Sequence, residues 1–152
     1  MDGPVATKTP WHLWVIGLVS LVWHAGGAID YTMTQTRNME YLNAAAAQAD
    51  VPVEVMLGYF GNWPAWAEAA WAFGVWGAVA GSLLLLLRTR YALYAFVVSL
   101  IGLLGTTVYT LTADLPDALD TPMMWAFSAA VYIVLIALVI YTRRMTARSV
   151  LR

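Results

Sequence analysis

Four long apolar segments dominate the chain, at residues 11–30, 63–87, 91–112 and 122–142. Each is about as long as the ~20 residues that a helix needs to cross the ~30 Å hydrocarbon core of a bilayer. The chain is 61% hydrophobic and 11% charged, and a small soluble domain could not bury that much apolar surface. The sequence therefore predicts an all-α fold: a four-helix transmembrane bundle that forms a single integral membrane domain over residues 1–152.

Basic residues are distributed unevenly between the two sides of this predicted bundle. Four spans place the N-terminus, the turn at 88–90 and the C-terminal tail on one side, which has Lys8, Arg88, Arg90, Arg143, Arg144, Arg148 and Arg152. The other side has only Arg37. Because Lys and Arg next to spans stay in the cytoplasm, we expect a multi-pass inner-membrane protein with both termini cytoplasmic.

The first apolar segment also has features of a cleaved signal peptide, namely Lys8 before it and the small residues 26–28 near its end. Its removal would leave three spans and would place the new N-terminus outside the cell. We therefore expect the segment to be retained as the first span.

The connection between the first two spans, residues 31–62, is long for a helical bundle, in which links usually have about 2–8 residues. Residues 38–49 are rich in alanine, and Asp50 with Pro52 resembles the start of a helix that continues to Tyr59. We expect a short helical segment on the extracytoplasmic side that lies on the membrane surface or covers the end of the bundle.

Polar side chains are costly in hydrocarbon, so their positions within the spans are candidate functional positions. Most of them fall in the outer half of the predicted bundle. Together with the aromatic ring of Trp71, these polar positions give the tentative substrate-binding residues His24, Asp30, Glu68, Trp71, Thr106, Tyr109 and Tyr132.

His24 and Glu68 are predicted to lie at similar depths in the membrane. His24 precedes Asp30 by six residues, about 9 Å of helix, and Glu68 follows Trp63 by five residues, roughly 7–8 Å. Such a pair would bind a proton or a polar ligand, or would form a structural hydrogen bond between two helices. Glu68 and Asp30 have a further alternative, which is to reach the aqueous interface.

A face of small residues follows the second span through Ala70, Gly74, Gly77 and Gly81. Small residues let two helix backbones approach closely in a membrane. We expect this face to pack against another helix, either of the same chain or of a partner chain.

Residue content argues against several classes of site. The chain has no cysteine, which excludes disulfides and thiolate metal sites. His12 and His24 lie about 18 Å apart on one helix, so one chain cannot hold a haem between two histidines. Phosphate loops, nucleophile elbows and HExxH motifs are absent. The acidic loop 114–120 could hold a hard cation, but we interpret it as a solvated loop.

From this content and the net charge of -1, we predict a protein that is not an enzyme. We also predict no cofactor, no metal site and no nucleic-acid partner.

Several motifs resemble those of a known family. They are WHAGGAIDYTMTQTRN at 23–38, Tyr41 with Leu42, Tyr59 with Phe60, PAW at 64–66, GSLLLLLR at 81–88 and YTRRM at 141–145. Together they resemble a bacterial four-helix inner-membrane family that is often labelled "sugar transporter". His24 stands where that family commonly has asparagine. The resemblance covers nearly the whole chain, and it implies the four-span fold and the bacterial inner membrane.

Two functions fit these observations. The first is a transporter of a small, sugar-like solute, with a polar site in the outer half of the bundle; four helices make a thin wall for a pathway, so this hypothesis includes a homodimer. The alternative is a non-catalytic scaffold or accessory subunit of a larger membrane complex. The expected partners are thus the lipid bilayer, a second copy or a larger complex, and a small polar solute.

Overall fold

The computed structural model describes residues 8–152, and the predicted domain boundary at residue 1 lies outside that part. The described residues form helices and no strand, which confirms the all-α class. The six helices are α1 (Trp11–Gln35), α2 (Met39–Ala49), α3 (Val53–Gly61), α4 (Ala65–Leu86), α5 (Tyr91–Thr112) and α6 (Pro122–Ala147). By length and composition, α1, α4, α5 and α6 could each cross a membrane. The chain is therefore a multi-pass membrane protein with four candidate spans.

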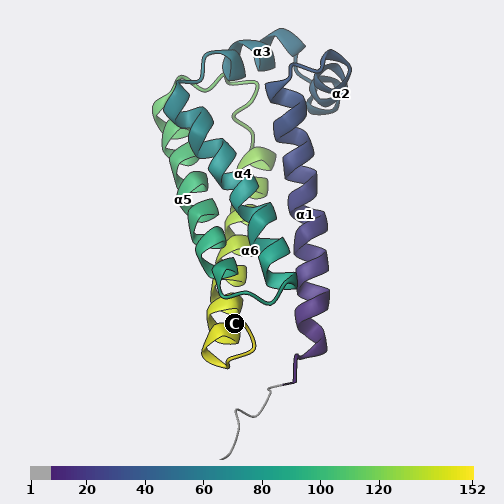
Figure 1. Cartoon of the computed structure of the whole chain (residues 1–152). Coiled ribbons are helices and arrows are strands. Elements are labelled where there is room, and N and C mark those ends of the chain that lie inside the picture. Colours follow the sequence, from purple (N-terminus) through teal and green to yellow (C-terminus); the bar gives the residue numbers. More distant parts are fainter. Residues whose placement is uncertain (1–7) are drawn as a thin grey trace, which may run out of the picture.

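The four long helices lie side by side, and α2 and α3 lie across one end of them (Figure 1). We call this end, which includes the loop at 113–121, the cap end. The opposite end has residues 8–10, the α4–α5 turn at 87–90 and the C-terminal tail at 148–152, and we call it the terminal end. The predicted helical segment between the first two spans is thus present as α2 and α3, and its extracytoplasmic position stays a prediction.

Local sequence sets the helix starts. The Thr121 side chain accepts a hydrogen bond from the Met124 backbone N–H at 3.2 Å, and Pro122 occupies the first position of α6. Asn38 caps α2 in the same way through the N–H of Tyr41, at 3.0 Å. α4 begins only after Pro64, at Ala65 rather than at the predicted residue 63, because proline keeps the preceding residue out of the helical conformation.

Two helices are longer than their apolar segments. α1 continues to Gln35 instead of ending at residue 30, and α6 continues to Ala147 instead of ending at residue 142. Threonine hydroxyls donate back to carbonyls in both extensions, for example from Thr32 to Ala28 and from Thr146 to Thr142. Hydropathy marks the part of a helix that suits lipid, so it misses polar turns that continue the helix into the interface.

α4 packs against both α1 and α5, and α6 packs against α5. The closest approach is between α4 and α5, where a methyl group on Gly102 would lie 2.8 Å from the Gly74 Cα and one on Gly77 would lie 3.0 Å from the Ser99 backbone nitrogen. The small-residue face of α4 is therefore a packing face, as predicted, and its partner is α5 of the same chain. This face is consequently not free to bind a partner chain.

The interior of the bundle is apolar near the terminal end and more polar near the cap end. An apolar cluster that includes Leu13, Leu85, Phe96 and Met145 fills the half near the terminal end. Toward the cap end the contacts between helices include hydroxyl groups, such as Thr107 bonded to Tyr132 at 2.8 Å. Large apolar side chains point outward from the spans, and Val22, Ile101, Met123 and Ile133 are all more than half exposed. Lipid is the solvent that such an exterior suits.

Candidate functional site

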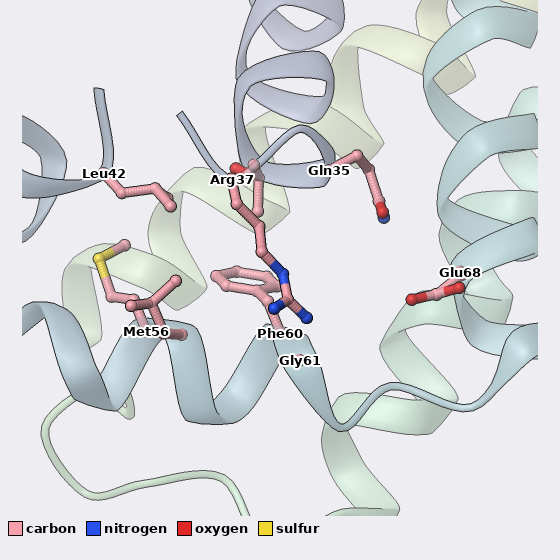
Figure 2. A pocket seen from close by; sticks show the side chains of 9 residues that line it. Gln35, Arg37, Leu42, Met56, Phe60, Gly61 and Glu68 are labelled. Atoms are coloured by element: carbon pink, nitrogen blue, oxygen red, sulfur yellow. The ribbon is translucent and has the colours of Figure 1, made fainter. Parts of the chain in front are cut away.

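A pocket of about 120 Å³ lies at the cap end, where α1, α2, α3 and α4 meet. We call it the cap pocket. Its lining combines polar and apolar residues, and Figure 2 shows most of them: Thr34, Gln35, Arg37, Leu42, Met56, Leu57, Phe60, Gly61 and Glu68. The pocket thus joins the last turn of a span, both cap helices and the first turn of the next span.

Arg37 and Glu68 place opposite charges in the cap pocket. Arg37 belongs to the turn between α1 and α2, where its backbone has φ 52°, and its guanidinium reaches over Gly61. Glu68 belongs to the first turn of α4, and its carboxylate points toward the pocket (Figure 2). A guanidinium has five N–H donors and a carboxylate only acceptors. Their combination can bind a solute that has both donor and acceptor groups.

Phe60 forms the aromatic wall of the cap pocket. Its ring stacks on Trp71 with centroids 5.4 Å apart and an interplanar angle of 23°. The Tyr31 ring packs edge-on against the Trp71 ring, with centroids 5.0 Å apart. The predicted solute-stacking residue, Trp71, is thus covered on one side by Phe60, and the ring that lines the pocket is that of Phe60.

His24 and Glu68 do not form the predicted pair. His24 is buried, and its Nδ1 lies 3.0 Å from the Ser82 hydroxyl. Because the single Ser82 hydrogen is donated to the Ala78 carbonyl, Nδ1 is assigned as the donor to Ser82. Ser82 lies fourteen residues from Glu68 along α4, about 21 Å. The depth prediction was wrong partly because α1 continues five residues beyond the predicted end, about 7.5 Å, and partly because α1 and α4 are offset along the bundle.

Asp30 points to the cap rather than to the interior. Its carboxylate accepts a hydrogen bond of 2.8 Å from the hydroxyl of Tyr41 on α2. Burial, and then the hydrogen bond and negative charge of Asp30, raise the pKa of Tyr41 to about 12. Asp30 is itself exposed, in agreement with the interfacial alternative. The contact fastens α2 to α1.

The remaining predicted residues lie elsewhere in the cap half. The Thr106 hydroxyl donates to the Leu103 carbonyl at 2.8 Å within α5, and Tyr132 is bonded to Thr107. Tyr109 packs on Trp63 with centroids 4.8 Å apart. It lines a second, wider hollow of about 560 Å³ between α3, the end of α5 and the following loop, together with Glu54 and Asp114 among others. Of the seven predicted residues, only Glu68 lines the cap pocket.

The sequence prediction missed most of the pocket lining, including Arg37, Gln35, Thr34 and Phe60. Arg37 did carry a signal, since it is the one basic residue on its predicted side of the membrane. The others belong to the 31–62 connection or to the extension of α1, whose packing has no periodic pattern to read. No cluster of three His, Asp or Glu side chains suited to a metal ion occurs within residues 8–152.

The fold and the pocket define a class: a multi-pass membrane protein with four candidate spans and a small polar pocket at one end of them. Comparison with family models, with curated proteins and with solved structures finds no match to the chain.

Proposed function

We propose that the protein binds a small polar solute, such as a sugar or a similar polyhydroxy compound, in the cap pocket and carries it across the membrane. The observation that carries the proposal is the convergence of Arg37, Glu68 and Phe60 on one pocket. Hydroxyl groups can donate to the carboxylate and accept from the guanidinium, and an aromatic ring suits the C–H face of a sugar.

The pocket volume restricts the solute. Pockets that enclose drug-sized ligands have about 300–1,000 Å³, whereas the cap pocket has about 120 Å³. It therefore suits a compact solute or one part of a sugar ring.

The proposal includes an orientation, an assembly and a non-enzymatic role. The seven basic residues at the terminal end favour the cytoplasmic side of a bacterial inner membrane for that end. The cap pocket would then face outward.

Four helices form a thin wall, so we propose a homodimer as the transporting unit. The absence of catalytic motifs from the sequence supports a role other than that of an enzyme. The scaffold alternative is weaker because α5 occupies the small-residue face.

The test is solute binding to the purified protein in detergent, followed by uptake into sealed vesicles. A panel of hexoses, pentoses and glycerol is titrated by calorimetry against the parent, Glu68→Gln and Arg37→Gln. Each change removes a charge-assisted hydrogen bond, which is worth about 1.5–3 kcal/mol, so binding should weaken at least about tenfold. Glu54→Gln is the matched control, because Glu54 is an acid of the cap that lines the second hollow.

Binding that is equally strong in the parent, Glu68→Gln and Arg37→Gln would refute the cap pocket as the site. Binding without uptake would remove the transport step. If the parent binds no member of the panel and instead purifies with a stoichiometric larger protein, the scaffold alternative is correct.

A further inference from the structure

The charges of the described residues are segregated between the two ends of the bundle. Every acidic residue within 8–152 lies at the cap end or in the half of a span next to it. The terminal end has seven basic residues: Lys8, Arg88, Arg90, Arg143, Arg144, Arg148 and Arg152. Within residues 8–152, no carboxylate side chain lies at this end to neutralise these arginines.

Three of these arginines are held together by the backbone. The N–H of Arg152 donates to the Arg88 carbonyl at 2.9 Å, and the N–H of Arg90 donates to the Arg152 carbonyl at 2.8 Å. The neighbouring tail residues Val150 and Leu151 are buried in the apolar core. The α4–α5 turn and the tail therefore form one fixed unit, and the three guanidinium groups start from neighbouring backbone positions.

The turn has buried polar atoms that the protein does not satisfy. The Nε of Arg88 and the hydroxyl of Thr89 are both buried without a hydrogen-bond partner. Arg88 adopts φ 59° and closes α4, with its N–H bonded to Leu85 and that of Thr89 bonded to Leu84. Partial burial of a guanidinium without an anion is unfavourable. Arg88 as a residue is only half-buried, so an anion from outside can reach its exposed part, although the Nε itself is covered.

Two exposed aromatic rings lie next to the α4–α5 turn. Tyr91 and Tyr94 follow the turn and are 57% and 64% exposed. The Arg90 guanidinium carbon lies 5.7 Å from the centroid of the Tyr91 ring. Tyrosine and tryptophan gather at the boundary between hydrocarbon and headgroups. The two tyrosines therefore favour a position of this turn near the headgroups of the adjacent leaflet.

We propose that the α4–α5 turn, with Arg88, Arg90 and Arg152, is a binding site for the phosphate of an anionic phospholipid. The chemistry is that of guanidinium with phosphate, in which the planar donor groups match the phosphate oxygens. The lipid supplies the counter-charge that the described part of the terminal end lacks, and its acyl chains lie along the apolar exterior. This site is independent of the cap pocket.

The test compares lipids in detergent micelles. The unfolding midpoint is followed while phosphatidylglycerol, phosphatidylcholine or inorganic phosphate is titrated into the parent protein. Only phosphatidylglycerol should stabilise strongly. The double variant Arg88→Gln/Arg90→Gln should weaken its apparent affinity roughly fivefold for each arginine, about 25-fold in total. Arg90→Gln alone, at an exposed position, should give the fivefold step even if the double variant folds poorly.

The matched control is Arg143→Gln/Arg148→Gln, which removes the same charge from exposed positions of α6 and the tail at the same end. We expect a much smaller loss of affinity for this pair. An equal loss in both double variants would mean a diffuse basic surface and would overturn the site. So would stabilisation by phosphatidylcholine equal to that by phosphatidylglycerol. Full stabilisation by inorganic phosphate would overturn the assignment to lipid.

Discussion

His24 is buried between helices and hydrogen-bonded to Ser82, and its ring lies against Phe96 with centroids 6.3 Å apart. Its contacts on α4 and α5 are thus a hydroxyl and an aromatic ring. This environment fits the structural alternative for His24, a bond that ties α1 to α4. The Nε2 atom is buried without a partner, and the Nδ1–H tautomer leaves it as an acceptor.

Removal of the Ser82 hydroxyl should destabilise the bundle. Hydrogen bonds between membrane helices average about 0.6 kcal/mol and reach about 1.7 kcal/mol in double-mutant cycles, so Ser82→Ala should lower the free energy of unfolding by about 1 kcal/mol. Unfolding in sodium dodecyl sulfate provides the measurement. The cycle of Ser82→Ala with His24→Leu should give a coupling energy of similar size.

The control cycle pairs His24→Leu with Glu68→Gln, whose effects should add because the two residues are far apart along the bundle. Coupling in this control cycle together with additivity between His24 and Ser82 would contradict the hydrogen-bond assignment. The same outcome would support the predicted contact between His24 and Glu68.

The helices α4 and α5 approach closely at small residues, so that backbone meets backbone at Gly74 and Gly102. Gly102 lies against Ala70 and Gly74, and Gly81 receives the Phe96 ring. Such contacts are the ordinary basis of association between membrane helices. Gly26 and Gly27 of α1 differ, since nothing lies within 4 Å of a methyl group placed on either of them.

Gly102→Ala should destabilise the protein by about 1–3 kcal/mol, the usual cost of overpacking, because the added methyl would contact the Gly74 backbone. Gly26→Ala is the matched change in open space and should cause no loss. The measurement is again the free energy of unfolding, for both variants in the same detergent. Equal stability of the two variants would show that α4 and α5 do not approach as closely as described.

For the cap, the local sequence pattern predicted helices but not how they pack. The alanine-rich stretch forms α2 as predicted, but Asp50 ends α2 in the left-handed conformation instead of starting the next helix, and α3 begins at Val53 after Pro52. Their packing was not predicted, because Leu42 and Ala46 become buried only when the cap folds onto its neighbours. The polar side chains at the end of α1 then line a pocket under the cap, and Gln35 stays exposed.

In the whole molecule, both described chain ends lie at the basic end and the cap lies at the acidic end (Figure 1). The charge distribution supports an orientation with the terminal end in the cytoplasm. Such an orientation would present the cap pocket to the outside and the turn arginines to the inner leaflet.

Cysteine labelling should establish this orientation, and the chain has no native cysteine to interfere. Asn43→Cys and Asp117→Cys are exposed at the cap end, and Ala147→Cys is exposed at the terminal end. An impermeant thiol reagent added outside the inner membrane should modify the first two and not the third. Modification of Ala147→Cys alone would reverse the orientation and place the cap pocket in the cytoplasm.

The number of spans, the all-α class and the helical cap followed from stretches of contiguous residues. Apolar length and capping are local properties, so they can be read without knowledge of the partner helix. The helix ends were less accurate, because the polar turns after residue 30 and after residue 142 continue helices beyond their apolar segments.

The contacts between side chains of different helices depended on how far the helices are shifted and rotated relative to one another. The extension of α1 to Gln35 and the axial offset between α1 and α4 together set Ser82, and not Glu68, beside His24. Glu68 was a candidate from the start, but Arg37 and Phe60 reached the same pocket only because the cap folds over the end of α4. Such contacts join residues that are distant in the chain, and hydropathy or helical periodicity holds no information about the relative placement of two helices.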